Sequence, residues 1–178
     1  LATLAKRTIL DFPNYYHFYK QLEFSYNDIK QHNRNPLLYK NMGVDGLKTG
    51  HTQAAGYGLT ASAVRGGRRL ILVVNGLPSK KARSKEPERL LEWGFREFNN
   101  YALFEKDTVV DKASVWLGKE ATVPLIIEQD VKITLARKSR KKMKVTVAFQ
   151  GPISAPIKKG DKIAVLKITA PGHNTLEI

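Results

Sequence analysis

Apolar and polar residues follow different periods in the two halves of the chain, and the change falls around residues 99–105. Before it, the opening LATLAKRTIL contains good helix formers, and Pro13 predicts that this helix ends near Asp11. After it, apolar and polar residues alternate with period two, which is typical of half-buried strands. The pattern predicts a first unit with helices and strands and a second unit built from strands.

The first unit is predicted to contain three successive strands. The first carries Lys48 to Gly50, and the second begins at Gly58. Gly66 and Gly67 separate the second strand from the third, and adjacent glycines supply the positive φ angles of a tight hairpin turn. We therefore expect an antiparallel sheet.

A helix is predicted to follow this sheet from about Pro87, a residue suited to the first helical turn. Four apolar residues recur at helical spacing and are expected on one face: Leu90, Leu91, Phe95 and Phe98. Four charged residues are expected to face water: Glu88, Arg89, Glu92 and Arg96. The helix should cover one face of the sheet.

The second unit is predicted to be a small all-β sandwich or barrel. In DVKITLA, the side chains of Val131, Ile133 and Leu135 should point inward, and KVTVAF and DKIAVLKI show the same alternation. We place the first domain at residues 1–102 and the β-rich domain at residues 103–178.

The amino-acid composition excludes several kinds of site and function for this chain. No apolar run approaches the roughly 18 residues that span a bilayer, and the absence of cysteine excludes disulfides and thiolate chemistry. The four histidines lie at positions 17, 32, 51 and 173 without ligand spacing, so no metal or organic cofactor is expected. The net charge of +14 is dispersed. Its one dense run, ARKSRKKMK, holds no aromatic residue for base stacking, so a solvated hairpin loop is expected there rather than nucleic-acid binding.

The stretch DGLKTGHTQAAG carries the candidate chemistry. On an extended strand the Lys48 and Gly50 positions point one way and Thr49 the other. A glycine leaves room for a ligand to lie flat against the strand and take its backbone hydrogen bonds. The triplet Lys48-Thr49-Gly50 is therefore suited to binding an extended, anionic peptide. The alternative is that the lysine and the threonine are solvated, as is ordinary on an edge strand.

The sequence VDGLKTGHTQAAGYGLTASAVRGGRRLILVVNG, followed by RSKEPERLLEWGF, resembles the low-molecular-mass penicillin-binding D-alanyl-D-alanine carboxypeptidases. The resemblance implies part of an α/β transpeptidase-like domain, an antiparallel sheet with helices, followed by a small all-β sandwich-like domain. It implies a serine peptidase that removes the terminal D-Ala from peptidoglycan stem peptides through an acyl-enzyme and is inhibited by β-lactams. It also implies a periplasmic protein peripheral to the inner membrane.

The resemblance assigns roles to individual residues. Lys48 would shape the field of the cleft and assist proton transfer, and Thr49 would bind the terminal carboxylate of the substrate. The backbone N–H of His51 would complete the oxyanion hole, beside Gly50. Arg83 would help to bind the carboxylate, because its planar fork suits that group. Each of the last two assignments has an alternative. His51 could be a surface histidine without a role in the site. Arg83 could form an ion pair with Glu86 or Glu88 across the start of the helix.

The family's nucleophile motif Ser-x-x-Lys is expected to be missing. Its one formal match, Ser139 to Lys142, lies in the basic run and is interpreted as accidental. The family's Ser-x-Asn triplet is expected to be missing as well. We expect this chain to be the C-terminal part of an enzyme whose upstream segment carries the serine, to be inactive alone, and to lack a C-terminal membrane anchor.

Two other functions stay open. The chain could be a non-catalytic module whose β-domain and basic surface bind cell-wall or membrane material. A β-lactamase of the same superfamily would need an additional deacylating carboxylate, for which the sequence offers no candidate. An upstream Ser-x-x-Lys would favour the enzyme.

Overall fold

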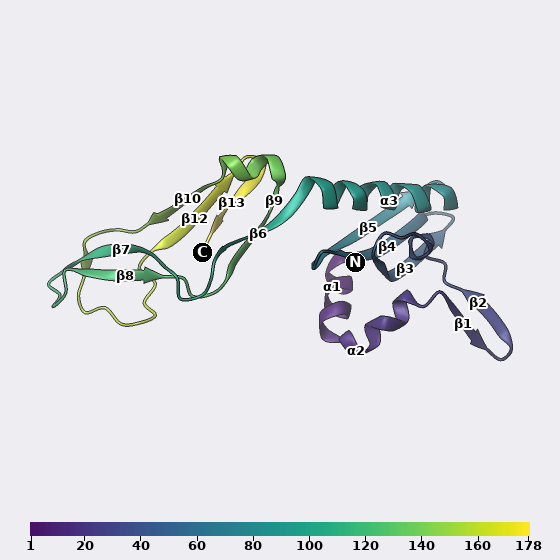
Figure 1. Ribbon diagram of the computed structural model, residues 1–178, viewed down its shortest axis with the longest axis horizontal. Coiled ribbons are helices and arrows are strands. Elements are labelled where there is room, and N and C mark those ends of the chain that lie inside the picture. Colours follow the sequence, from purple (N-terminus) through teal and green to yellow (C-terminus); the bar gives the residue numbers. More distant parts are fainter. The chain divides into compact units, whose positions relative to one another are not determined.

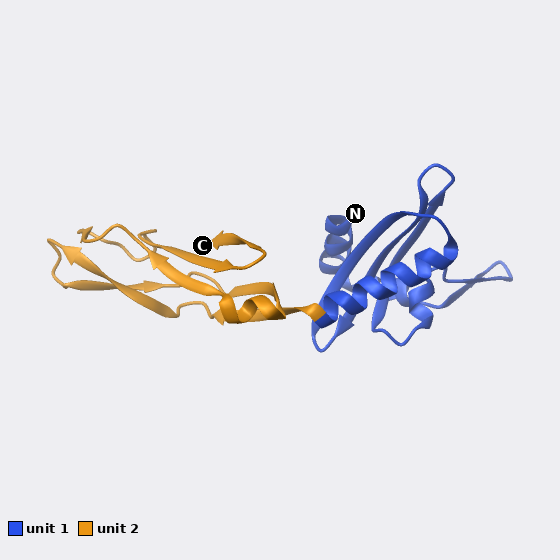
Figure 2. Ribbon diagram, turned by 90° about the horizontal axis from the view of Figure 1, so that it is seen from above, with its two compact units in different colours: residues 1–96 blue, residues 97–178 orange.

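The computed structural model describes all 178 residues, which form two compact units, Leu1–Arg96 and Glu97–Ile178 (Figure 2). The second unit therefore begins at Glu97, earlier than the boundary at residues 102 and 103 that the sequence suggests. That domain assignment stays a prediction.

The first unit opens with short helices and a hairpin (Figure 1). These elements are α1 (Ala2–Asp11), α2 (Pro13–Tyr16), η1 (His17–Lys20), β1 (Glu23–Tyr26), β2 (Ile29–His32) and η2 (Pro36–Tyr39). The predicted end of the first helix at Asp11 is confirmed, since Pro13 starts a separate helix.

A three-stranded antiparallel sheet follows, in the order β3-β4-β5. Its strands are β3 (Val44–Thr52), β4 (Gly56–Arg65) and β5 (Arg68–Leu77). The glycine turn is confirmed, because Gly66 and Gly67 have φ angles of 53° and 73°. Strand β3 is an edge strand, paired along one side only, and this leaves backbone groups available on the other side.

The helix after the sheet begins earlier than predicted. Helix α3 spans Lys80–Glu97, and its start is capped by Ser79, whose Oγ accepts a hydrogen bond from the Ala82 N–H at 3.0 Å. Pro87 lies inside the helix, so the start predicted there is wrong. The serine cap, and not the proline, determines where the helix begins. Phe98, predicted on the helix, is the first residue of the following strand.

Each face of the sheet has its own apolar core, and Figure 1 shows α3 lying along one face. On that side Leu91 of α3 packs with Leu59 and Ala61, and Phe95 lies at the edge of the cluster. The prediction that the helix covers one face is confirmed. The second core joins α1 and α2 to the sheet through Ala5, Tyr16 and Leu47.

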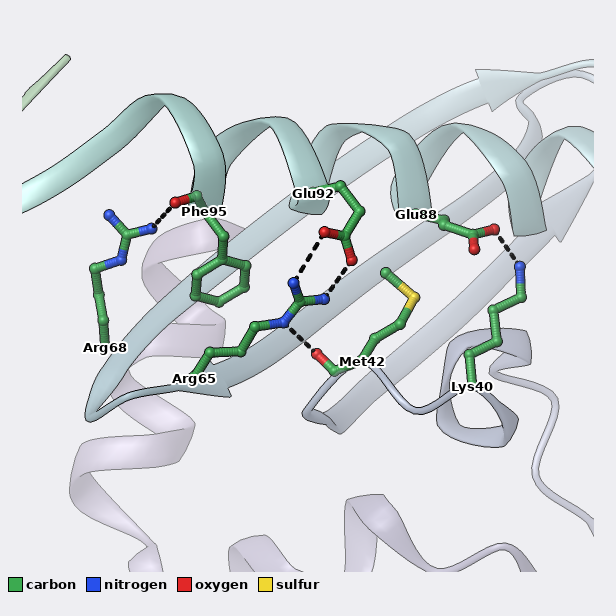
Figure 3. A network of polar contacts seen from close by, with 7 residues as sticks. All are labelled: Lys40, Met42, Arg65, Arg68, Glu88, Glu92 and Phe95. Atoms are coloured by element: carbon green, nitrogen blue, oxygen red, sulfur yellow. Dashed lines mark hydrogen bonds and ion pairs between the residues drawn. The ribbon is translucent and has the colours of Figure 1, made fainter. Parts of the chain in front are cut away.

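Ion pairs also attach α3 to the sheet side of the unit (Figure 3). The Arg65 guanidinium donates two hydrogen bonds to the Glu92 carboxylate, at 2.5 and 2.9 Å, and its Nε donates to the Met42 carbonyl at 2.8 Å. Lys40 pairs with Glu88. The hydrogen bonds with Arg65 lower the pKa of Glu92, and those with Glu92 raise the pKa of Arg65. Both acidic residues that were expected to face water, Glu88 and Glu92, therefore form ion pairs with residues outside the helix, Lys40 and Arg65.

The second unit is built from strands and one short helical turn. Its elements are β6 (Phe98–Phe104), β7 (Val109–Trp116), β8 (Thr122–Ile126), β9 (Val131–Ala136), η3 (Arg137–Lys142), β10 (Lys144–Ala148), β11 (Ile153–Ser154), β12 (Val165–Ala170) and β13 (His173–Glu177). They form a two-stranded sheet β6-β9 and two three-stranded sheets, β10-β12-β13 and β11-β7-β8.

One core joins two of these sheets. Val131, Ile133 and Leu135 of β9 are at most 5% exposed and pack with Leu166 and Ile168 of β12. The predicted inward positions and the sandwich-like arrangement are confirmed. The predicted hairpin around the basic run is wrong, because β9 pairs with β6 while β10 pairs with β12. The basic residues form the turn η3 instead.

We expect Glu92→Gln to lower the free energy of unfolding by roughly 0.5–1 kcal/mol at neutral pH, the range for partly exposed pairs. Because the pKa of Glu92 is lowered in the folded chain from 4.5, its stabilisation is present above that value and is lost as the pH falls through the lowered pKa. Urea titrations from pH 7 to pH 3 should show the two proteins converging. A constant difference would contradict this assignment.

Glu86→Gln is the matched control. Glu86 forms an i,i+3 pair with Arg89 on the same helix, and the Arg89 side chain is 68% exposed. Its removal should change stability less than the loss of Glu92 does.

Candidate active site

The predicted Lys-Thr-Gly triplet lies on the edge strand β3. Lys48 and Gly50 are exposed, whereas the Thr49 side chain is only 8% exposed, so the expected alternation is present. The Lys48 Nζ donates a hydrogen bond to the Thr49 carbonyl at 2.7 Å, which holds the ammonium group against its own strand. A cation therefore stands at the open side of β3.

The triplet lines a cavity of 390 Å³ in the first unit. Its other lining residues come from α1, the neighbouring strands and the segment around η1: Leu1, Leu4, Ala5, Thr8, Tyr19, Leu47, Gly58, Leu59, Thr60 and Asn75. A Cβ added at Gly50 would meet no atom within 4 Å. The open space that the sequence predicts beside this glycine is present.

His51 and Arg83 meet at a third residue, Tyr57. The rings of His51 and Tyr57, which are cross-strand partners on β3 and β4, have centroids 4.0 Å apart. The Cζ of Arg83, in the first turn of α3, lies 5.3 Å from the Tyr57 ring centroid. The structure thus joins the far end of the triplet strand to the start of the helix.

The Arg83 Nε is buried and has no hydrogen-bond partner. The alternative in which Arg83 pairs with Glu86 or Glu88 is wrong, because those carboxylates bind Arg89 and Lys40. A buried donor without a partner costs roughly 1–3 kcal/mol, so Arg83 keeps an unused donor that an anionic group could satisfy.

Strand β3 is fixed at its other end by a polar network. The Asp45 Oδ1 accepts hydrogen bonds from the Tyr16 hydroxyl and the Arg69 Nη1, each at 2.9 Å. Arg69 also donates to the Ser62 hydroxyl, and the buried Asn35 donates from Nδ2 to the Gly46 carbonyl at 3.0 Å. Burial, with a smaller effect of the Asp45 charge, raises the pKa of Tyr16 to about 12. These contacts hold β3 just ahead of Lys48.

Sequence reasoning missed Tyr57 and most of this network. The hairpin register offered a signal for Tyr57, because a strand pair that turns after Thr52 places positions 51 and 57 opposite each other. The two partners of Asp45, Tyr16 and Arg69, come from separate segments, and no sequence spacing indicates that they meet.

No serine is among the residues that line the cavity beside Lys48. Ser139 is 5% exposed and donates its hydroxyl to the Pro171 carbonyl at 2.9 Å, which gives it a structural role in the second unit. Ser62 is fully buried. A formal Ser-x-Asn does occur at Ser25 to Asn27, so its stated absence is wrong, but it lies at the turn of the exposed β1–β2 hairpin.

Two further properties of the chain are plain. No group of three or more His, Asp or Glu side chains is arranged to hold a metal ion. None of the helices combines the length and the apolar character needed to cross a membrane.

Both units match known protein families. The sequence profile of the D-alanyl-D-alanine carboxypeptidase family matches residues 1–79, and that of the penicillin-binding protein 5 C-terminal domain matches residues 98–177. Arg83 lies between the two matched ranges.

Curated relatives and a solved structure agree with these matches. D-alanyl-D-alanine carboxypeptidase DacC of Escherichia coli (strain K12) is 38% identical over 98% of this chain and 44% of DacC. DacA of the same organism is 37% identical over 97% of this chain and 43% of DacA. The crystal structure of penicillin binding protein 5 from Haemophilus influenzae superposes with a TM-score of 0.84 at 35% identity, over 99% of this chain and 53% of that chain. The chain therefore spans less than half of the length of these curated relatives.

We expect the free energy of unfolding to fall steeply between pH 10 and pH 12, and to fall less in Tyr16→Phe. Because the pKa of Tyr16 is raised from 10.0 to about 12, the folded chain keeps this proton while the unfolded chain loses it, so stability is lost as the pH rises through that window. Urea titrations at several pH values provide the measurement.

Tyr15→Phe, at a position that is 66% exposed on the same helix, is the control and should retain the parent's pH dependence. Equal slopes for the parent and the Tyr16 variant would mean that Tyr16 is not buried as described.

Proposed function

The chain belongs to the D-alanyl-D-alanine carboxypeptidase family, and from this membership we propose that it forms one wall of the active site of a serine-type peptidase. The substrate is the peptidoglycan stem peptide, from which the enzyme removes the terminal D-Ala through a serine acyl-enzyme. β-Lactams, acting as substrate analogues, acylate the same serine. One observation carries the proposal: the edge strand β3 presents Lys48 to His51 beside open space, with Arg83 at its end.

The substrate adds to the free edge of β3 as an extended strand. Gly50 lets the peptide lie flat, since nothing occupies the space beside its Cα. The backbone N–H of His51 then donates to the oxyanion that develops during acyl transfer, and such donors contribute roughly 2.7–4 kcal/mol to transition-state stabilisation. Lys48 supplies positive charge and assists proton transfer at the serine.

Two residues bind the terminal carboxylate of the substrate in this proposal. Thr49 lines the cavity and donates its hydroxyl from there. Arg83 donates from the buried Nε that has no partner within the chain. A guanidinium matches the planar geometry of a carboxylate, which a lysine would not.

The nucleophile comes from a segment outside this chain. Five of the seven aromatic residues between positions 12 and 26 are more than half exposed: Phe12, Tyr15, Phe18, Phe24 and Tyr26. Of these seven residues only Tyr16 is buried within the chain. An apolar surface of this size supports a packing partner here, and we propose the upstream serine-bearing segment. The 178 residues alone are inactive.

The complete protein acts on the cell wall in the periplasm and contributes to cell shape. A C-terminal anchor outside this chain holds it at the inner membrane. These proposals rest on the family membership and on the proposed substrate, which is found in that compartment.

One observation favours the alternative function of a binding module. Turn η3 exposes Arg137, Lys138, Arg140, Lys141 and Lys142, and none of them forms an ion pair. An unpaired basic surface attracts polyanions of the wall or membrane. In this reading the complete protein binds such material and is not acylated by a penicillin.

A polypeptide that joins this chain to a Ser-x-x-Lys segment should form a covalent adduct with a fluorescent penicillin, visible after denaturing electrophoresis. Lys48→Ala should slow the adduct's formation by at least about a hundredfold, the usual effect of losing acid–base assistance. Because Lys48 is exposed, thermal stability should hardly change.

Lys85→Ala, which removes an exposed lysine from α3, is the control and should react at the parent's rate. The enzyme assignment fails if a folded parent protein is not labelled at all.

Gly50→Ala separates ligand binding from folding. The added methyl meets no atom of the chain within 4 Å, so the melting temperature should stay within about a degree or two of the parent's. The methyl should block the peptide's approach and lower the rate of adduct formation about tenfold or more.

Gly58→Ala should behave in the opposite way. Its Cβ would lie 2.6 Å from the Asn75 Oδ1 and 3.2 Å from the Val74 carbonyl oxygen, so this variant should lower the melting temperature. A Gly50→Ala protein labelled at the parent's rate would contradict the proposed binding mode.

A further inference from the structure

Tyr57 occupies a position between two residues of the proposed site and has no chemical role of its own there. It pairs with His51 across the β3–β4 hairpin and with Leu77 on β5. Its ring centroid lies 4.0 Å from that of His51 and 5.3 Å from the Arg83 Cζ. Two strands and the first turn of α3 therefore meet at this side chain.

The contact between Tyr57 and Arg83 differs from the other arginine contacts of the first unit. Arg65 and Arg69 also lie over aromatic rings, but each of them is in addition bound to a carboxylate, Glu92 and Asp45 respectively. Arg83 forms no ion pair, and its Nε is buried without a partner.

An aromatic face attracts a guanidinium through its π electrons but accepts no conventional hydrogen bond. A carboxylate in the same place would hold the arginine equally well and would also occupy its donors. A ring therefore fixes the cation and leaves its donors free for a ligand. An aliphatic side chain would leave the donors free but would not fix the cation.

We propose that Tyr57 is a positioning residue that holds the Arg83 guanidinium beside the His51 end of β3, so that its free donors bind the terminal carboxylate of an extended peptide. This inference rests on the proposed function, because it assigns the ligand of Arg83 to that substrate. Tyr57 acts through Arg83 and does not contact the reacting atoms.

The first test uses the 178-residue chain and needs no activity. The Arg83 Nε–Hε resonance in a proton–nitrogen NMR spectrum should be shifted by the ring current of Tyr57. Tyr57→Phe keeps the ring and should keep this shift, whereas Tyr57→Leu should abolish it and should speed the exchange of the Hε with solvent. An unchanged Arg83 resonance in Tyr57→Leu would overturn the inference.

The second test uses a polypeptide that also carries the Ser-x-x-Lys segment, with a peptide ending in D-Ala-D-Ala as substrate. Tyr57→Leu should raise KM about threefold to thirtyfold, the worth of a cation–π contact, and leave kcat within about twofold. Tyr57→Phe should restore the parent's KM. A merely structural role for Tyr57 would instead lower kcat and the melting temperature together, and that result would overturn the inference.

Tyr101→Leu is the matched control. Tyr101 in the second unit holds Arg140 at the same distance, 5.3 Å from its ring centroid, but lies on β6, outside the proposed site. Its loss should leave KM unchanged, and a KM rise equal to that of Tyr57→Leu would overturn the inference.

A folded parent with no activity would overturn the proposed function and this inference with it. An active parent with an unaltered KM in Tyr57→Leu would overturn this inference alone.

Discussion

The Asp45 carboxylate fixes the strand on which the proposed chemistry depends. It binds Tyr16 from α2 and Arg69 from β5, and the amide of Asn35 holds the next carbonyl along the strand, that of Gly46. A charged group that is partly removed from water is stable only when such partners satisfy it. The network therefore fixes the position of β3 shortly before Lys48, and in this way it also positions the triplet that follows on the same strand.

The other end of the triplet depends on where α3 begins. Ser79 caps the helix, and this places Arg83 in the first turn, where its guanidinium reaches Tyr57 at the end of the β3–β4 hairpin. A helix that began at Pro87 would leave Arg83 in a connecting loop. The Ser79 cap and the Tyr57 ring thus place the Arg83 guanidinium near the end of the edge strand. Its Nε remains without a hydrogen-bond partner.

The second unit is stabilised independently. Its core joins β9 to β12 across two sheets. The basic turn η3 is attached to this unit by the hydrogen bond from the Ser139 hydroxyl to the Pro171 carbonyl. The hydroxyl of the formal Ser-x-x-Lys pattern is therefore engaged in a hydrogen bond within the second unit. The serine of that pattern faces the protein, while the cations around it face solvent.

The sequence by itself determined whatever depends on local periodicity: the three strands and their glycine turn, the apolar face of α3 at Leu91, the inward positions of β9, and the triplet on β3. It misplaced the start of α3 at Pro87 and paired the strands around η3 wrongly. It could not show Tyr57 beside Arg83 or Asp45 between Tyr16 and Arg69. Only the tertiary structure decided these contacts, because each joins residues from separate elements, and a favourable contact across such distances depends on packing of the whole unit and not on spacing along the chain.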